Sequence, residues 1–317
     1  VKEASEAVSQ DMGDQALFDL LSSMLSDIKD AHVRLTGEVD GEPRRFFAFN
    51  GQTREATFEI GERDGLGRGE ASDRFNGAYW NDGVRDTLLN EEGMVAGAGR
   101  IRFGMVEDGI GYIAIVSEGG YTDEDEDDEF AALDAAMDRA IGHFEENNAE
   151  AVIVDLSVNF GGYDSISRAI ASRFAEQRTF AYTKRAEDAP ASPAVPLYIN
   201  PSEHERFTGP VYLLTSDITV SAGEILTMSM RALPNVTHVG QKTRGALSDV
   251  LEKNLPNGWV LTLSNEVYTD SEGLLWEGRG IPPEIEIPVF DLDNPPAGHV
   301  DAVRAVVKLA RERSAAH

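Results

Sequence analysis

The sequence has no cysteine, so disulfides, thiolate metal sites and thiol catalysis are excluded. Basic residues are also scarce: 28 Lys and Arg stand against 56 Asp and Glu, giving a formal net charge of −28. Such a surface repels nucleic acid and anionic membranes, so we expect neither as a partner. No apolar run reaches the roughly 18 residues of a membrane span. The opening residues also lack the charged start and apolar stretch of a signal peptide.

What the chain does contain is enough apolar sequence for a large core. Its 317 residues are 41% hydrophobic and 26% charged, which suits one large domain or one domain with a smaller attachment. The texture of the sequence changes near residue 96. We therefore predict an N-terminal helical and partly β cap over residues 1–95 and an α/β core over residues 96–317.

In the cap, apolar residues spaced by three and four predict a helix over residues 15–30 that ends near His32. Short alternating runs at 44–51 and 55–61 predict a small, partly β region, with no carboxylate-binding loop of a PDZ domain. The acidic stretch 123–129 lacks the glycine and the ligand spacing of a calcium loop, so we interpret it as a solvated loop.

The core alternates between strand and helix patterns, which indicates an α/β fold. The expected strands are 109–116, 151–157, 211–216 and 237–241, the expected helices are 130–147, 166–177, 222–233 and 300–313, and a hairpin-like pair is expected from 258–269 and 273–278.

Two turns between a strand and a helix contain candidate functional residues. Ser221, with Glu224 three residues later, matches a capping box, and it equally suits a nucleophile at the positive end of a helix. The pair Gly161 and Gly162 follows another strand; it either permits a tight turn or leaves an N–H free for an oxyanion. Residues alone leave both choices open.

A serine nucleophile needs a base, and the chain has six histidines. His32 is the one best held by a scaffold, although a histidine at a helix end is commonly a C-cap. His238 lies in a strand and is expected to be structural. The other four lie at the terminus, in a proline-rich stretch, in a polar stretch or among charged residues.

Four blocks together resemble a known family: "DLSVNFGG" (155–162), "GPVYLLTSDITVSAGEILT" (209–227), "VGQKTRGALSD" (239–249) and "LLWEGRGIPPEIEI" (274–287). In this order and spacing they are similar to the conserved blocks of the tail-specific, or C-terminal processing, serine peptidases. The stretch 20–35 resembles the helix of that family that leads to a histidine. The resemblance implies a ClpP/crotonase-like ββα spiral core beneath the cap.

Within the family, Ser221 matches the nucleophile, and Ala222 with Gly161 and Gly162 matches the oxyanion donors; the resemblance does not choose between the two glycines. The tail-specific branch uses a Ser-Lys dyad, but its lysine position is Ala246 here. The sequence resembles more closely the branch of the tricorn core and the retinoid-binding proteins.

That branch has a Ser-His-Glu set, whose positions here are His32 and Glu277. The branch often has a hydroxyl residue beside the histidine, where this chain has Ala31. Ser157 stands where the family usually has arginine. Lys242 is a weak alternative base, because it lies three to four residues from the dyad position.

The resemblance implies a serine endopeptidase that cleaves peptides or unfolded protein segments through an acyl-enzyme at Ser221, with no metal or cofactor. An alternative on the same fold is a non-catalytic protein that binds an apolar ligand or peptide near Phe160, Tyr163 and Trp276. A crotonase-type acyl-CoA enzyme ranks last, because it gives no reason for a Ser-His-Glu set. Export is expected by analogy with bacterial members, and the oligomeric state is left open.

Overall fold

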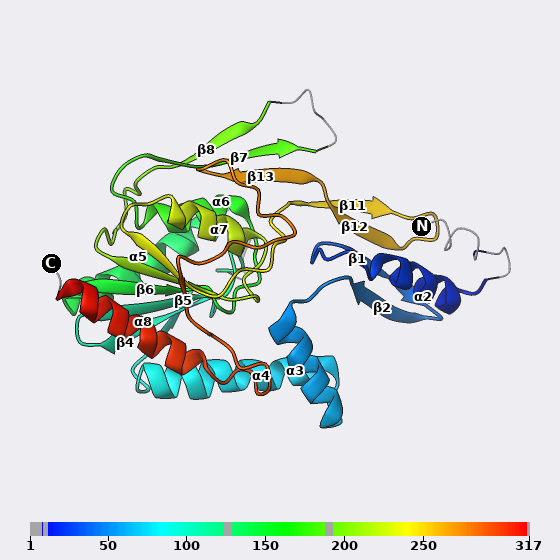
Figure 1. Cartoon of the computed structure of the whole chain (residues 1–317), viewed down its shortest axis with the longest axis horizontal. Coiled ribbons are helices and arrows are strands. Elements are labelled where there is room, and N and C mark those ends of the chain that lie inside the picture. Colours follow the sequence, from blue (N-terminus) through cyan, green and yellow to red (C-terminus); the bar gives the residue numbers. More distant parts are fainter. Residues whose placement is uncertain (1–7, 9–11, 123–128, 188–192, 316–317) are drawn as a thin grey trace.

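A seven-stranded mixed sheet forms the centre of the molecule (Figure 1). The computed structural model describes residue 8 and residues 12–122, 129–187 and 193–315. The strand order is β14-β10-β9-β6-β5-β4-β3, parallel from β14 to β5 and antiparallel from there to β3. The bounds are β3 Met94–Ala96, β4 Ile101–Glu107, β5 Ile110–Ile115, β6 Ala151–Asp155, β9 Val211–Thr215, β10 Val236–Gly240 and β14 Ile285–Glu286.

Helices cover both faces of this sheet, which explains why its inner strands are apolar along their whole length. On one face lie α5 (Glu129–Glu146), α6 (Asp164–Ser172) and α7 (Ala222–Arg231). On the other lie α4 (Arg68–Gly77), the π-helix η1 (Ala78–Leu88) and α8 (His299–Ser314). All residues of β5, β6 and β9 are buried.

A second sheet joins strands from the N-terminal region to a hairpin from the C-terminal third of the sequence. Its order is β11-β12-β1-β2, with β1 Arg34–Val39, β2 Glu42–Phe47, β11 Val250–Asn254 and β12 Val260–Ser264. Helix α2 (Asp14–Leu25) packs on it through Phe18, whose ring lies 5.4 Å from that of Trp259. The hairpin of β11 and β12 therefore belongs with the N-terminal strands in space (Figure 1). The predicted boundary at residues 95 and 96 stays a prediction.

A third, three-stranded sheet of order β13-β7-β8 lies beside α6 and α7 (Figure 1). Its strands are β7 Thr179–Ala186, β8 Val195–Ile199 and β13 Glu266–Asp270. The hairpin predicted from residues 258–269 and 273–278 is present only at its tip, as an isolated antiparallel bridge between Thr269 and Leu275. The rest of the first stretch is divided between β12 and β13 in two different sheets.

The α/β prediction for the core is confirmed, and two predictions for the cap are wrong. Helix α2 ends at Leu25, so His32 lies in a turn before β1 rather than at a helix end. Residues 55–61 lie in helix α3 (Gln52–Arg63), not in a strand. Small residues spaced by four, ending in Gly61, face inward there, and a Cβ added at Gly61 would lie 2.5 Å from the Ala71 Cβ of α4. Close helix packing thus explains a pattern that resembled strand alternation.

Two further expectations concern surfaces. Residues 123–128 of the acidic stretch lie outside the described residues. Within the described ranges, no helix has both the length and the apolar character that crossing a membrane requires.

Candidate active site

Ser221 lies where β9 and its following turn give way to α7, with φ 60° and ψ −127°. A non-glycine residue at positive φ is strained and is held there by its surroundings. Its N–H donates to the Ala246 carbonyl at 2.9 Å. Ser221 and Glu224 occupy the two positions of the predicted capping box, but the Ser221 side chain makes no capping hydrogen bond. The hydroxyl therefore remains available at the start of the helix.

Glu224 holds this turn against the loop 243–246. Its carboxylate accepts hydrogen bonds from the Thr243 hydroxyl at 2.6 Å and from the N–H groups of Gly245 at 2.7 Å and Ala246 at 2.8 Å. The Ser221 N–H lies 3.3 Å from its Oε2. Burial raises the pKa of Glu224, and the hydrogen bonds act in the opposite direction. The residue predicted as a cap thus joins the helix start to the neighbouring loop.

The two glycines differ in what their backbones do. The Gly161 N–H donates to Asn159 Oδ1 at 2.9 Å, so it is already occupied. A Cβ added at Gly161 would lie 2.6 Å from the Ser221 Cβ, which explains the need for glycine. Across the described ranges, neither Gly162 nor Ala222 donates its N–H to any protein acceptor. These two N–H groups are therefore the available pair beside Ser221.

Asn159 and Glu118 support the turn at Gly161 and Gly162 through hydrogen bonds. Neither residue was predicted from the sequence. The Asn159 amide donates to Glu118 Oε1 at 2.7 Å and to the Ile115 carbonyl at 2.9 Å. Glu118 is fully buried, and burial raises its pKa to about 8. Its Oε2 has no partner among the described residues. The only signal in the sequence is an acidic residue just after an apolar strand.

His32 is buried, with an exposed fraction of 1%. The backbone N–H of His32 donates to Asp30 Oδ1 at 2.8 Å, and its backbone carbonyl accepts a hydrogen bond from the Thr262 hydroxyl on β12. Burial lowers its pKa to about 4, against the opposing charge of Asp30. The imidazole is therefore neutral at pH 7 and can accept a proton. Within the described part of the chain, its Nδ1 has no hydrogen-bond partner.

Glu277 is half-buried beside the same loop. Its Oε2 accepts from the N–H groups of Leu247 at 2.9 Å and Ser248 at 3.0 Å. Burial, and after it the charge of Asp30, raises its pKa to about 7. Its Oε1 is buried and, like His32 Nδ1, finds no partner among the described side chains and backbone groups.

The structure gathers the three predicted residues around residues 246–248 without joining them. Ala31, next to His32, packs on Val220 and Ala246. No hydrogen bond between Ser221, His32 and Glu277 occurs in the described ranges. Ala246 is fully buried, so an apolar contact fills the position of the dyad lysine. Lys242 is exposed and lines a different cavity, away from Ser221.

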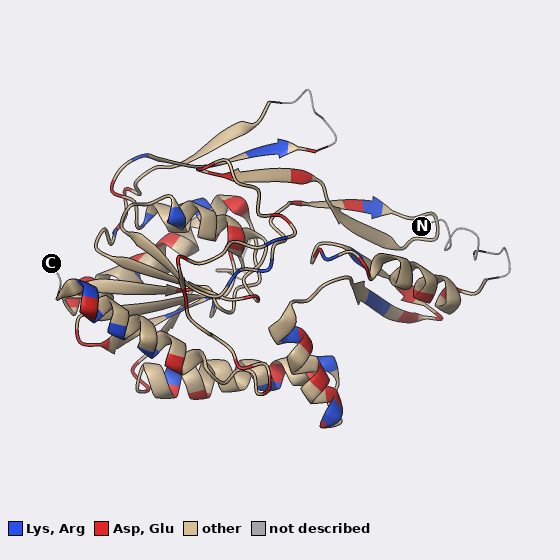
Figure 2. Ribbon diagram, viewed as in Figure 1, with Lys and Arg blue, Asp and Glu red and all other residues tan. Residues whose placement is uncertain are grey.

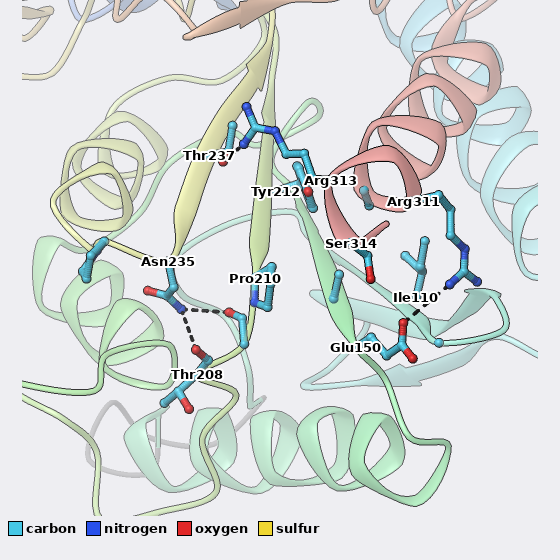
Figure 3. Close-up of a pocket in the computed structure, with 15 residues that line it drawn as sticks. Ile110, Glu150, Thr208, Pro210, Tyr212, Asn235, Thr237, Arg311, Arg313 and Ser314 are labelled. Carbon is cyan, nitrogen blue, oxygen red and sulfur yellow. Dashed lines mark hydrogen bonds and ion pairs between the residues drawn. The ribbon is translucent and has the colours of Figure 1, made fainter. Parts of the chain in front are cut away.

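A cavity of about 880 Å³ opens in front of Ser221, and His32 and Gly162 line it together with Phe160. A second cavity of about 480 Å³ lies at the other end of the central strands, among the amino ends of the parallel strands and the end of α8 (Figure 3). Arg311 approaches Glu150 there at 3.7 Å. None of the predicted catalytic residues lines that second cavity.

The sequence profile of peptidase family S41 matches residues 109–287, more than half of the chain. The chain therefore belongs to peptidase family S41, and it is a serine peptidase by class. Ser221 and Glu277 lie inside the matched segment, whereas His32 lies outside it.

Three solved structures share the fold. A candidate peptidase from Parabacteroides merdae has a TM-score of 0.72 and 24% identity, over 97% of this chain and 86% of that one. CPAF complexed with lactacystin has a TM-score of 0.58 and 18% identity, over 74% of this chain and 59% of that one. A candidate S41 protease from Bacteroides fragilis has a TM-score of 0.52 and 18% identity, over 68% and 58%. The chain thus spans less than two thirds of the last two proteins.

Proposed function

We propose that the protein hydrolyses peptide bonds in peptides or unfolded protein segments through an acyl-enzyme on Ser221. The observation that carries this proposal is the Ser221 turn. Among the described residues, neither the hydroxyl of this strained serine nor the two N–H groups beside it has a hydrogen-bond partner, and the serine shares its cavity with a neutral histidine. A helix cap alone would explain neither the free hydroxyl nor the unoccupied N–H groups.

The proposed reaction begins when Ser221 Oγ attacks the carbonyl carbon of the substrate while His32 takes the hydroxyl proton. The N–H groups of Gly162 and Ala222 stabilise the resulting oxyanion. The carbon–nitrogen bond then breaks, and His32 returns the proton to the leaving amine. Water, deprotonated by His32, hydrolyses the ester and regenerates Ser221.

Glu277 is proposed to orient His32. His32 Nδ1 and Glu277 Oε1 are both buried without a partner in the described ranges, and a hydrogen bond between them would satisfy both atoms. An ionised Glu277 would also stabilise the imidazolium that forms during catalysis. We therefore assign the chain to the Ser-His-Glu branch of the family rather than the Ser-Lys branch, in agreement with the burial of Ala246.

Fluorophosphonate labelling, followed by intact mass and peptide mapping, tests the nucleophile and its base. We expect one adduct on Ser221, lost in Ser221→Ala and strongly slowed in His32→Ala. Ser26→Ala, which removes an exposed hydroxyl in the turn after α2, is the matched control and should label like the wild type. An adduct elsewhere, or labelling that survives Ser221→Ala, would refute the assignment.

Ser221, His32 and Glu277 are not hydrogen-bonded to one another in the described ranges, and this favours one alternative function, that of a non-catalytic binding protein. Phe160 lines the cavity in front of Ser221, whereas Tyr163 and Trp276 do not. Such a protein would bind an apolar ligand or peptide stoichiometrically, and Ser221→Ala would leave that binding unchanged. A folded protein that forms no adduct and releases an apolar ligand on extraction would support this alternative.

A further inference from the structure

The cavity in front of Ser221 is basic, although the protein is strongly acidic. Five arginines line it, and no Asp or Glu does so among the described residues: Arg34, Arg45, Arg54, Arg68 and Arg244. In the whole sequence, acidic residues outnumber basic ones by 56 to 28. In the ribbon of Figure 2, acidic and basic positions both occur along the helices around the central sheet, and β2 carries a basic segment. The lining of this cavity is therefore basic within an otherwise acidic protein.

The lining arginines are not neutralised by ion pairs in the described ranges. Arg34 Nε donates to the Ala31 carbonyl at 3.2 Å, and Arg244 Nε donates to the Asp217 carbonyl at 3.0 Å. The guanidinium groups of Arg54 and Arg68 lie over the ring of Phe58, at 5.4 and 4.8 Å from its centroid. These contacts hold the side chains in place without a direct ion pair, and neighbouring carboxylates such as Glu55 and Asp217 offset part of their charge through space.

The carboxylates nearest the cavity are engaged elsewhere. Asp30 accepts the His32 N–H, and Asp217 accepts from the N–H of Thr53 at 2.8 Å and from its hydroxyl. Asp249 pairs with Lys184.

The arginines also repel one another. Burial, followed by the charge of Arg54, lowers the pKa of Arg244 to about 10, against the opposing charges of Asp217 and Glu224. Burial lowers the pKa of Arg54; the charge of Glu55 opposes this shift, and the charge of Arg68 adds to it. Each remains charged at pH 7, so an anionic partner would relieve this repulsion.

We propose that this cleft selects polypeptide segments rich in carboxylates, with acidic side chains beside the scissile bond held by the arginines. This inference rests on the proposed function and names the substrate class of the same site. Guanidinium groups bind carboxylates through charge-assisted, often bidentate hydrogen bonds. Phe47, Phe49, Phe58 and Phe160 also line the cavity and would accept apolar neighbours of the acidic residues.

The negative exterior does not prevent such a substrate from binding. At physiological ionic strength, charges more than about 8 Å apart are largely screened, so the exposed acidic residues act weakly across the molecule. Arginines that line the cleft act at contact distance, where screening is small. Binding inside the cleft is therefore governed by the local charge and not by the net charge.

The first experiment measures binding without turnover, using Ser221→Ala and fluorescein-labelled peptides. One probe is a six-residue peptide with Phe-Ala at its centre and two Glu on each side; its twin has Gln at all four positions. By fluorescence anisotropy, we expect the Glu probe to bind at least about tenfold more tightly, since several charge-assisted contacts are involved. The preference should shrink as NaCl is raised.

Arginine variants locate the effect. In the Ser221→Ala background, Arg45→Gln with Arg68→Gln should reduce the preference for the Glu probe by about tenfold. Both side chains are exposed at the cavity, so the fold is expected to tolerate the change. Arg304→Gln with Lys308→Gln removes the same charge from the exposed face of α8, outside this cavity, and should leave the preference unchanged.

The outcomes separate this inference from the proposed function. Equal binding of the two probes, or an equal loss in the α8 variant, would overturn the inference while leaving Ser221 labelling intact. Tight binding of the Glu probe by a protein whose Ser221 never labels would retain the charge selectivity and overturn the peptidase proposal. Amidating the C-terminus of both probes separates side-chain from terminal carboxylates. Loss of binding of both probes on amidation would assign the arginines to a chain end, contrary to our proposal.

Discussion

Replacing the buried Glu118 by glutamine should stabilise the protein at neutral pH. Glu118 is fully buried, and burial raises the pKa of its carboxyl from 4.5 to about 8. A carboxyl whose pKa is higher in the folded state binds protons more tightly there. Its favourable contribution is therefore complete below the unfolded pKa and is lost as the pH rises through the folded pKa. Glutamine keeps the shape of the side chain and a carbonyl oxygen that can accept from Asn159, but it does not ionise.

The size of the effect follows from the two pKa values. Each pKa unit corresponds to about 1.4 kcal/mol, so the free energy of unfolding of the wild type loses about 3 kcal/mol from this group between pH 5.5 and 8. Glu118→Gln should not show this loss. The variant should therefore gain about 3 kcal/mol over the wild type across that interval, with most of the gain present by pH 7.

Urea unfolding followed by tryptophan fluorescence measures the difference at each pH. This pH interval lies above the sequence pI of about 4.5. It therefore avoids the pH near the pI, at which the protein would carry little net charge and tend to associate. Glu146→Gln makes the same charge change at an exposed position and serves as the control. A difference between wild type and Glu118→Gln that is constant with pH would show that Glu118 does not titrate as its burial implies.

Three further predictions concern the site and its support. Glu277→Gln should lower kcat by about a hundredfold or more. In a pH-rate profile it should also remove the rise of kcat/KM near pH 7 that ionisation of the wild-type carboxyl produces. An unchanged profile would exclude Glu277 from catalysis. Gly161→Ala should reduce Ser221 labelling by about a hundredfold, because its Cβ would meet the Ser221 Cβ at 2.6 Å, whereas Gly258→Ala, which has a similar positive φ but open space, should label normally. His299→Ala should lower the free energy of unfolding by about 3 to 5 kcal/mol in urea titrations, since His299 Nε2 lies 2.7 Å from the buried Asp155; a loss below about 1 kcal/mol would contradict a buried pair.

The core was predictable because its elements are specified locally. The apolar runs at β5, β6 and β9 and the helix patterns of α5, α7 and α8 lie within a few residues of their predicted bounds. The second sheet was not predictable, because β1 pairs with β12, more than two hundred residues away. Periodicity describes one segment at a time and does not identify the partner of a strand.

The chemistry of the site was predictable in part. Blocks of sequence placed Ser221, His32 and Glu277 as candidates, and the structure gathers them around one loop. The proposed choice of Gly162 over Gly161 as an oxyanion donor rests on the Asn159 contact, which depends on the position of a single amide group. His299, which the sequence placed in a proline-rich stretch, is instead a buried partner of Asp155.

The candidate base and the candidate nucleophile are held by different sheets. His32 is attached to the second sheet through the bond from Thr262, whereas Ser221 follows β9 of the central sheet. The packing of Ala31 on Val220 and Ala246 joins these two parts next to the site. The distance between base and nucleophile therefore depends on how the second sheet sits against the central one. A substrate segment bound between them would contact both parts at once, and its binding energy is then available to bring His32 into hydrogen-bonding distance of Ser221.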